Sequence, residues 1–129
     1  MNTRSPPTLA ERWAEVDSAN RLLRNVVEAL DFVAESEGWP VPFSPVRFLV
    51  LAHLHNATAF GLTPSRLAWL LRMPTSSMAH HLDVLEENGW VDRRQRNLHD
   101  GRAVSVRLTL LGAATYLRLG SQVLPFRPG

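Results

Sequence analysis

The chain contains no cysteine and no lysine. The absence of cysteine excludes disulfides, thiolate zinc sites and thiol redox sensing. No run of about 18 apolar residues occurs, so the sequence predicts no membrane-spanning helix and no membrane partner. Residues 1–13, MNTRSPPTLAERW, lack the apolar core of a secretory signal peptide. We therefore expect a cytoplasmic protein.

Patterns typical of enzymes are also missing. No carboxylate pair, no nucleophile with a neighbouring base and no glycine-rich phosphate loop occurs at a spacing that serves catalysis. His53 and His55 lie two positions apart on an expected helix and face different directions, and the adjacent pair His80–His81 is equally poor geometry for one metal ion. We expect no enzymatic activity, no cofactor and no resident metal.

The cations are all arginine and are unevenly placed. Codon usage explains the lack of lysine more readily than function does, but it leaves every cation as a planar guanidinium suited to phosphate. Residues 1–59 hold five Arg and seven acidic residues, whereas residues 60–129 hold nine Arg and five acidic residues. This split indicates a scaffold half followed by a half that binds nucleic acid.

A long helix is expected near the N-terminus. Thr8-Leu9-Ala10-Glu11 matches the S/T-x-x-E capping box, and apolar residues recur at helical spacing until Gly38 ends the run. One apolar stripe alternates steps of four and three, the rhythm of a helix packed along a partner helix. Either the rest of the chain or a second copy covers this stripe, and we favour a homodimer. Its interface residues are Leu9, Trp13, Val16, Asn20, Leu23, Val27 and Leu30.

Four shorter helices are expected after this one. Ser44-Pro45 and Thr63-Pro64 each place a cap before a proline, and they begin helices over residues 45–57 and 63–72. Two more are expected over residues 75–88 and about 110–124, the last capped by Thr109. The apolar residues expected to face inward are Val46, Leu49, Val50, Leu54, Leu67, Ala68, Leu71, Met78, Leu82 and Leu85.

Residues 93–109, RRQRNLHDGRAVSVRLT, contain five arginines. Val104, Val106 and Leu108 alternate with polar residues, and Asp100-Gly101 supplies turn chemistry, so a two-stranded hairpin with one packed face is predicted. The arginines are either a solvated charge cluster or a surface that contacts a phosphate backbone, and we favour the second.

Helix, tight turn, helix, strand and basic hairpin follow one another in the order of a winged helix-turn-helix. A helix about 10–12 Å wide fits a major groove about 12 Å wide, and arginine is favoured in a narrow minor groove. We predict a mainly α fold with a small β-hairpin wing at residues 93–107. Residues 1–42 form a dimerisation helix and linker, 43–109 the DNA-binding domain, and 110–129 a short helix that contributes to the dimer.

Three stretches resemble the MarR (multiple antibiotic resistance regulator) family of transcription regulators: LTPSRLAWLL, SSMAHHLDVLEENGWVDRR and DGRAVSVRLTLLG. The last is the most specific, since it resembles the family's wing pattern of Asp-x-Arg and a strand ending Leu-Thr-x-x-Gly. The resemblance implies a repressor that binds double-stranded DNA as a homodimer at a pseudo-palindromic operator. SMAHHLDVLEENGWV also resembles the ArsR metal-sensor family, but that family's cysteine site is absent.

The resemblance also implies roles for residues. Arg102 enters the minor groove and Asp100 braces it, while residues of the helix over 75–88 face bases and phosphates. The implied DNA-binding set is Arg66, Thr75, Ser76, Ser77, Ala79, His80, Arg94, Arg96, Asp100 and Arg102. Relatives bind small aromatic acids between the dimer arms and the DNA lobe. The candidates for such a pocket are Trp13, Trp39, Phe43 and His55, with core packing as the alternative.

Several positions depart from the family pattern. The helix over 75–88 has no Arg or Lys, and His80 stands where relatives often have Arg. Pro74 replaces the usual Ser cap, which costs about 1 kcal/mol unless a following hydroxyl supplies another cap. Arg72 replaces the usual turn glycine.

Apolar residues also occupy positions where relatives are mostly polar. Exposed together, Trp69, Leu70, Leu110 and Leu111 would form an apolar patch that marks a partner, a ligand or extra packing. They support an alternative function, a winged-helix protein-interaction module that does not bind DNA specifically.

Overall fold

A computed structural model describes residues 5–39, 43–57, 60–96 and 104–123 of the chain. The expected element order is confirmed, and the fold is mainly helical with one antiparallel hairpin. Within these ranges no helix is long and apolar enough to cross a membrane. The elements are α1 (Leu9–Glu37), α2 (Pro45–His55), α3 (Pro64–Leu70), α4 (Thr75–Glu87), β1 (Val91–Arg96), β2 (Val104–Leu108) and α5 (Leu110–Val123).

Both ends of α1 follow the sequence signals. The Glu11 backbone N–H donates to Thr8 Oγ1 at 3.1 Å, and the Thr8 N–H donates to Glu11 Oε2 at 3.2 Å, which completes the capping box. At the other end Gly38 has φ 67°, the left-handed conformation that glycine adopts without a Cβ penalty. These caps account for a helix of 29 residues.

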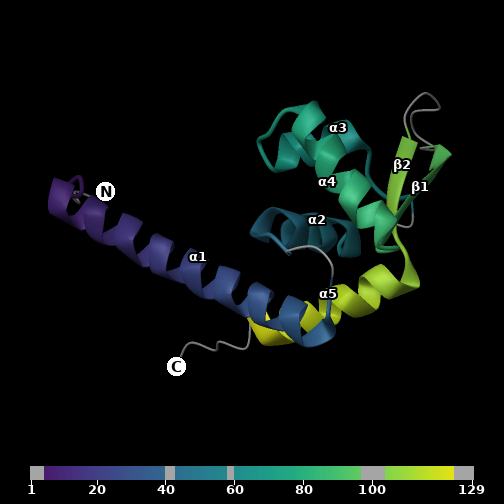
Figure 1. Cartoon of the computed structure of the whole chain (residues 1–129). Coiled ribbons are helices and arrows are strands. Elements are labelled where there is room, and N and C mark those ends of the chain that lie inside the picture. Colours follow the sequence, from purple (N-terminus) through teal and green to yellow (C-terminus); the bar gives the residue numbers. More distant parts are fainter. Residues whose placement is uncertain (1–4, 40–42, 58–59, 97–103, 124–129) are drawn as a thin grey trace.

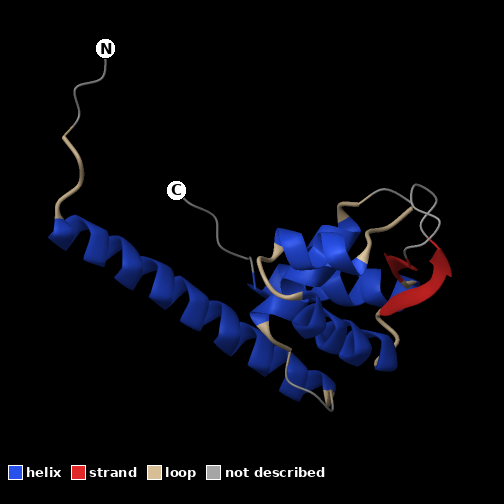
Figure 2. Cartoon of the chain, turned by 90° about the horizontal axis from the view of Figure 1, so that it is seen from above, coloured by secondary structure: helices blue, strands red, loops and turns tan. Residues whose placement is uncertain are grey.

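Helix α1 is a projecting arm. Its N-terminal half stands clear of the lobe that the other elements form (Figures 1 and 2). Only its C-terminal part joins the core, through the buried side chains of Leu30, Val33 and Ala34. This part of α1 packs against α5, which also packs against α2. Helix α5 therefore connects the arm to the lobe.

The caps expected for α2 and α3 are confirmed, whereas α4 begins without one. The Arg47 N–H donates to Ser44 Oγ at 3.2 Å, and the Arg66 N–H donates to Thr63 Oγ1 at 3.1 Å. Pro74 precedes α4 and no side chain caps this helix. Just before it, Arg72 has φ 54°, so a residue with a long side chain occupies the left-handed position where relatives have glycine.

Most of the expected core is confirmed, and α2 supplies the exception. Leu67, Met78, Leu82 and Leu85 are fully buried as expected. On α2, however, Leu49 is 44% exposed, while Phe48 and Leu51 are buried. The expectation for Leu49 was wrong because VRFLVLAHL is apolar nearly all round, so periodicity does not single out one face.

The wing pairs β1 with β2, with a register shift between Asp92 and Gln95. The expectation of one packed face is only partly right, because Val106 is buried but Val104 is 41% exposed and Ser105 is buried instead. The cause is a segment that covers the other side of β2. Leu62 pairs with Val106 through two backbone hydrogen bonds of 3.0 and 2.7 Å, and Ser105 Oγ donates to the carbonyl of Phe60.

Candidate nucleic-acid interface

Helix α4 divides cleanly into a buried face and an exposed face. Met78, Leu82 and Leu85 recur at steps of four and three and are fully buried. The opposite face presents small and polar side chains, and all five residues that the sequence predicted to face DNA are exposed on it: Thr75, Ser76, Ser77, Ala79 and His80. Because no side chain caps α4, its first-turn N–H groups also face outward with the positive end of the helix dipole.

A histidine fixes α4 to α2. Arg47 Nε donates to His81 Nδ1 at 3.2 Å. This bond needs a neutral imidazole, and burial, helped by Arg47 and His80, lowers the pKa of His81 below its ordinary value. Its neighbour His80 is exposed, as predicted. Sequence reasoning missed the pairing, since residues 34 positions apart carry no local signal of contact.

The wing arginine Arg93 forms ion pairs within the chain. Its Nη2 lies 2.7 Å from Asp83 Oδ1 and 2.8 Å from Glu86 Oε1, and its backbone N–H donates to Glu86 Oε2 at 3.2 Å. These hydrogen bonds lower the pKa of Glu86 and raise that of Arg93. Arg93 therefore ties β1 to α4 and neutralises two carboxylates on that helix.

Arg94 is placed differently. Its side chain is 86% exposed and pairs with Asp92, with Nη2 3.0 Å from Asp92 Oδ2. A pair this exposed contributes little stability and opens readily to another anion. Arg107 stands opposite Asp92 on β2 and is half-buried, and its Nε has no hydrogen-bond partner among the described residues. Arg96 ends β1, whereas Asp100 and Arg102 lie outside the described residues.

The Leu-Thr-x-x-Gly stretch joins the wing to α5. Thr109 Oγ1 donates to the Gly89 carbonyl at 2.5 Å and accepts from the Gly112 N–H at 2.9 Å. A Cβ at Gly112 would lie 1.9 Å from the Trp90 carbonyl oxygen, so only glycine allows α5 to approach this closely. The Leu-Thr-x-x-Gly stretch therefore fixes how closely α5 packs against the base of the wing.

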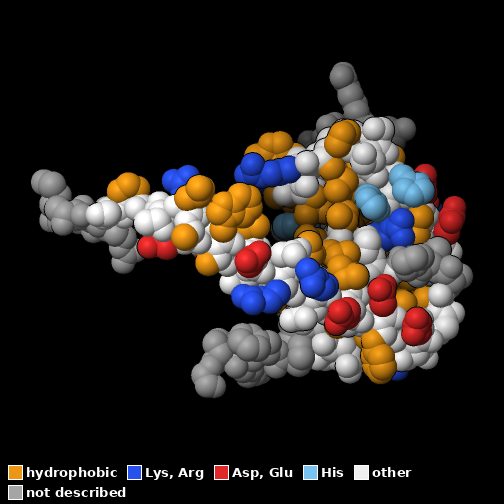
Figure 3. All heavy atoms as spheres, turned by 60° about the vertical axis from the view of Figure 1, so that its left-hand side comes forward, with side chains coloured by type: hydrophobic (Ala, Val, Ile, Leu, Met, Phe, Trp, Pro, Cys, Tyr) orange, Lys and Arg blue, Asp and Glu red, His pale blue; other side chains and the backbone are white. Residues whose placement is uncertain are grey.

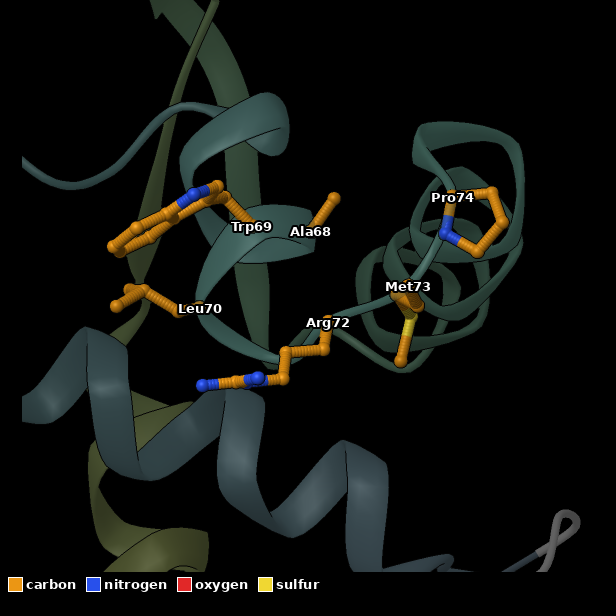
Figure 4. Close-up of a pocket in the computed structure, with 6 residues that line it drawn as sticks. All are labelled: Ala68, Trp69, Leu70, Arg72, Met73 and Pro74. Atoms are coloured by element: carbon orange, nitrogen blue, oxygen red, sulfur yellow. The ribbon is translucent and has the colours of Figure 1, made fainter.

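Arg66 lies on α3 and is exposed, and its guanidinium carbon stands 4.6 Å from the centre of the Trp69 ring. Trp69 itself is 68% exposed. Figure 4 shows the side chains of Trp69, Leu70 and Arg72 extending to the same side of the α3–α4 segment, where they line a hollow. The stacking holds the guanidinium at the surface beside α4.

The four unusual apolar residues do not form one patch. Trp69 and Leu70 belong to α3, whereas Leu110 and Leu111 belong to α5, at the opposite end of the lobe (Figure 1). The expectation of a joint surface was therefore wrong. Helix α4 and the β-hairpin separate the two pairs along the chain, so their shared apolar character does not place them on one face.

The exposed stripe on α1 fits the predicted dimer interface with one correction. Leu9, Trp13, Val16 and Leu23 are more than half exposed, and hydrophobic side chains gather along the arm (Figure 3). Asn20 is exposed among them and Val27 is half-buried. Leu30, however, is fully buried inside the chain, so it has no surface to offer a partner. The stripe passes into the core where α5 meets the arm.

The four candidate pocket residues are not brought together. Trp39 and Phe43 form a cluster with Trp90, with ring centres 5.1 to 5.5 Å apart. Trp13 lies on the far part of the arm, and at 1.5 Å per residue it is roughly 36 Å from the end of α1. His55 belongs to another cluster, 4.8 Å from the Tyr116 ring. A single chain therefore does not build the predicted pocket.

Comparison with known proteins agrees with this geometry. No curated protein matches the chain significantly. Residues 41–103 match the sequence profile of the MarR family. Apo wild-type MarR from E. coli is 26% identical, with a TM-score of 0.71, over 93% of this chain and 79% of that one.

Two further structures share the fold at lower identity. A mutant MarR from E. coli complexed with operator DNA is 24% identical, with a TM-score of 0.62, over 92% of this chain and 80% of that one. The regulator BldR from Sulfolobus solfataricus is 19% identical, with a TM-score of 0.67, over the same shares. The profile match runs from the start of the lobe into the wing, and the structural likeness adds the arm. The chain has the fold of MarR-family winged-helix transcription regulators, and residues 41–103 match that family's profile.

Proposed function

We propose that the chain is a repressor that binds a pseudo-palindromic operator in double-stranded DNA as a homodimer. The observation that carries this proposal is the exposed face of α4, which presents small polar side chains and an uncapped N-terminus to solvent. The opposite face of the same helix is buried in the core. Such a face can approach base edges and phosphates closely. MarR-family regulators are generally not enzymes, and we assign this chain no catalytic activity.

The electrostatic part of binding comes from beside α4. The helix carries no arginine, and two of its three acidic residues, Asp83 and Glu86, would repel phosphate if Arg93 did not neutralise them. Arg66 and Arg94 are exposed on either flank. We assign phosphate contacts to these two and to Arg96, and a minor-groove contact to Arg102, braced by Asp100. The base-facing residues are Thr75, Ser76, Ser77, Ala79 and His80.

The arm supplies the dimer. Residues 1–42 present the apolar stripe of Leu9, Trp13, Val16, Asn20, Leu23 and Val27, residues 43–109 bind DNA, and residues 110–129 complete the interface. Covering this stripe removes apolar surface from water, at about 25 cal/mol per Å². Two-fold symmetry then sets the two α4 helices about one DNA turn apart, about 10–10.5 bp.

The proposed regulator acts in the cytoplasm and responds to a small aromatic effector. An effector changes DNA affinity only if it binds one spacing of the two α4 helices more tightly than another. Of the four residues predicted to line its pocket, Trp39 and Phe43 lie together. Within the described residues, no group of three His, Asp or Glu could hold a metal ion.

The test is selection of bound fragments from the source genome by the purified protein. We expect an enriched inverted repeat, bound by a dimer whose mass is measured by light scattering. Arg102→Ala should weaken binding by about 1–3 kcal/mol, the range for a specific DNA contact. Arg24→Ala, which removes an exposed arginine from the arm, is the matched control and should bind as wild type. No enrichment at low salt by a folded dimer would refute the proposal.

Trp69 favours a second candidate function. A tryptophan that is 68% exposed beside a hollow suits a protein partner. Salt separates the two functions, because DNA binding by several arginines weakens steeply with salt while apolar contact does not. Trp69→Ala should abolish capture of a protein partner, and because Trp69 only orients Arg66 it should weaken operator binding slightly.

A further inference from the structure

A cavity of ≈330 Å³ lies where the arm, the root of the wing and α5 meet, away from the face of α4. Trp39 and Trp90 line it, joined by Leu111 and Thr115 of α5. The ion pair between Glu37 and Arg118 lines it as well, with Arg118 Nη2 2.5 Å from Glu37 Oε1. Its size falls within the range of small-molecule sites, about 300–1,000 Å³.

The aromatic wall is formed by rings that pack on one another, and a hydroxyl without a partner among the described residues lies beside it. The Trp39 and Trp90 ring centres are 5.3 Å apart at 67°, and both rings pack on Phe43. Thr115 is only 6% exposed, yet its hydroxyl bonds to no other described residue. This hydroxyl can both donate and accept, so it remains available to a water or a ligand in the cavity. Two indoles at this angle form the corner of an aromatic cage, which favours cations.

The ion pair decides the charge of the ligand. The Glu37 side chain is 25% exposed and belongs to the last residue of α1, whereas the Arg118 side chain is 64% exposed on a long flexible stem. Arg118 can swing into water at little cost. Displacing Glu37 would instead require movement of the helix end. Leaving Glu37 unpaired would also be unfavourable, because its partly buried carboxylate would have no compensating charge. A cation that replaces Arg118 keeps Glu37 compensated, whereas an anion that replaces Glu37 does not.

We propose that this cavity is a binding site for an organic monocation, a protonated amine on an aromatic ring. The ring packs against Trp39, and the ammonium group binds Glu37 and the Thr115 hydroxyl in place of Arg118. The binding event does not depend on the proposed DNA function. Because the cavity joins α1, the wing root and α5, its occupant would also tie the arm to the wing.

Calorimetric titration of the whole protein tests this with three probes of matched size at neutral pH, namely benzylammonium, benzyl alcohol and benzoate. We expect benzylammonium to bind about tenfold more tightly than benzyl alcohol, from its charge-assisted hydrogen bond and cation–π contact. Benzoate should bind most weakly. The NMR signals of the Trp39 and Trp90 indole N–H groups should shift, while those of Trp13 and Trp69 should not.

Variants of the ion pair move affinity in opposite directions. Glu37→Gln should weaken benzylammonium binding about tenfold, and Arg118→Ala should tighten it several-fold because the competing cation is gone. Glu35→Gln, on an exposed position of the same helix turn, is the control and should bind as wild type. Thermal melts verify that each variant is folded. The tighter benzylammonium binding expected for Arg118→Ala cannot arise from unfolding. Preference for benzoate, weaker cation binding by Arg118→Ala, or no binding of benzylammonium would each overturn the proposal.

Discussion

The backbone of Arg72 gives a prediction of stability that can be worked out from two opposing terms. Its φ of 54° is left-handed, which costs a residue with a side chain about 1–2 kcal/mol. Arg72→Gly removes this cost, but glycine also makes the unfolded chain more flexible, which costs roughly 0.5–1 kcal/mol. The Arg72 side chain is exposed, and its N–H bond to the Trp69 carbonyl at 3.2 Å stays in place. The net expectation is a gain of about 0.5–1 kcal/mol.

Urea unfolding at one fixed protein concentration measures this gain in unfolding free energy. The melting temperature of Arg72→Gly should be roughly 2–4 °C above that of wild type. Arg72→Ala is the matched control, because it removes the same side chain and keeps the strained backbone. The expected order of stability is glycine first, then wild type together with alanine. If Arg72→Gly were no more stable than Arg72→Ala, the turn would not be left-handed in solution, and the reasoning from φ would be refuted.

Two further predictions concern the groups that hold α4. The lowered pKa of His81 means that the folded state favours neutral imidazole, so its contribution to stability is complete above pH 6.5 and is lost as the pH falls below that value. The unfolding free energy of wild type should therefore drop more between pH 7.5 and 5.5 than that of His81→Gln. Equal slopes in the two proteins would contradict this. Arg93→Ala should destabilise the fold by about 1–2 kcal/mol, whereas Arg94→Ala should leave stability nearly unchanged. Only Arg94→Ala should weaken operator binding without loss of stability. Similar losses of stability in urea for both variants would show that the two ion pairs are equivalent.

Local signals predicted the elements of this fold well. The capping box at Thr8, the cap-proline pairs at Ser44 and Thr63, and Gly38 each satisfy backbone groups within a few residues, so sequence alone identifies them. The buried face of α4 was equally readable, because its apolar residues alternate with polar ones. Each of these features depends on a single element.

Features that depend on two elements were missed or wrong. Leu30 continues the apolar stripe of α1 without a break, and only the position of α5 removes it from the exposed surface. Ser105 is polar by type, and only the Phe60 carbonyl explains its burial. The proposed cation site draws on residues from three parts of the chain, so no spacing in the sequence could have indicated it.

The arginines of the wing show why charge counted along a sequence overstates the charge that DNA meets. Arg93 is held by two carboxylates and Arg107 is half-buried, so neither is free to release a counterion on binding. If Arg66, Arg94, Arg96 and Arg102 each neutralise one phosphate in both subunits, the logarithm of affinity should fall against the logarithm of salt concentration with a slope of about −7. Counting Arg93 and Arg107 as well would give about −11. A measured slope near the larger magnitude would mean that the Arg93 ion pairs open on DNA, leaving Asp83 and Glu86 uncompensated beside the phosphates.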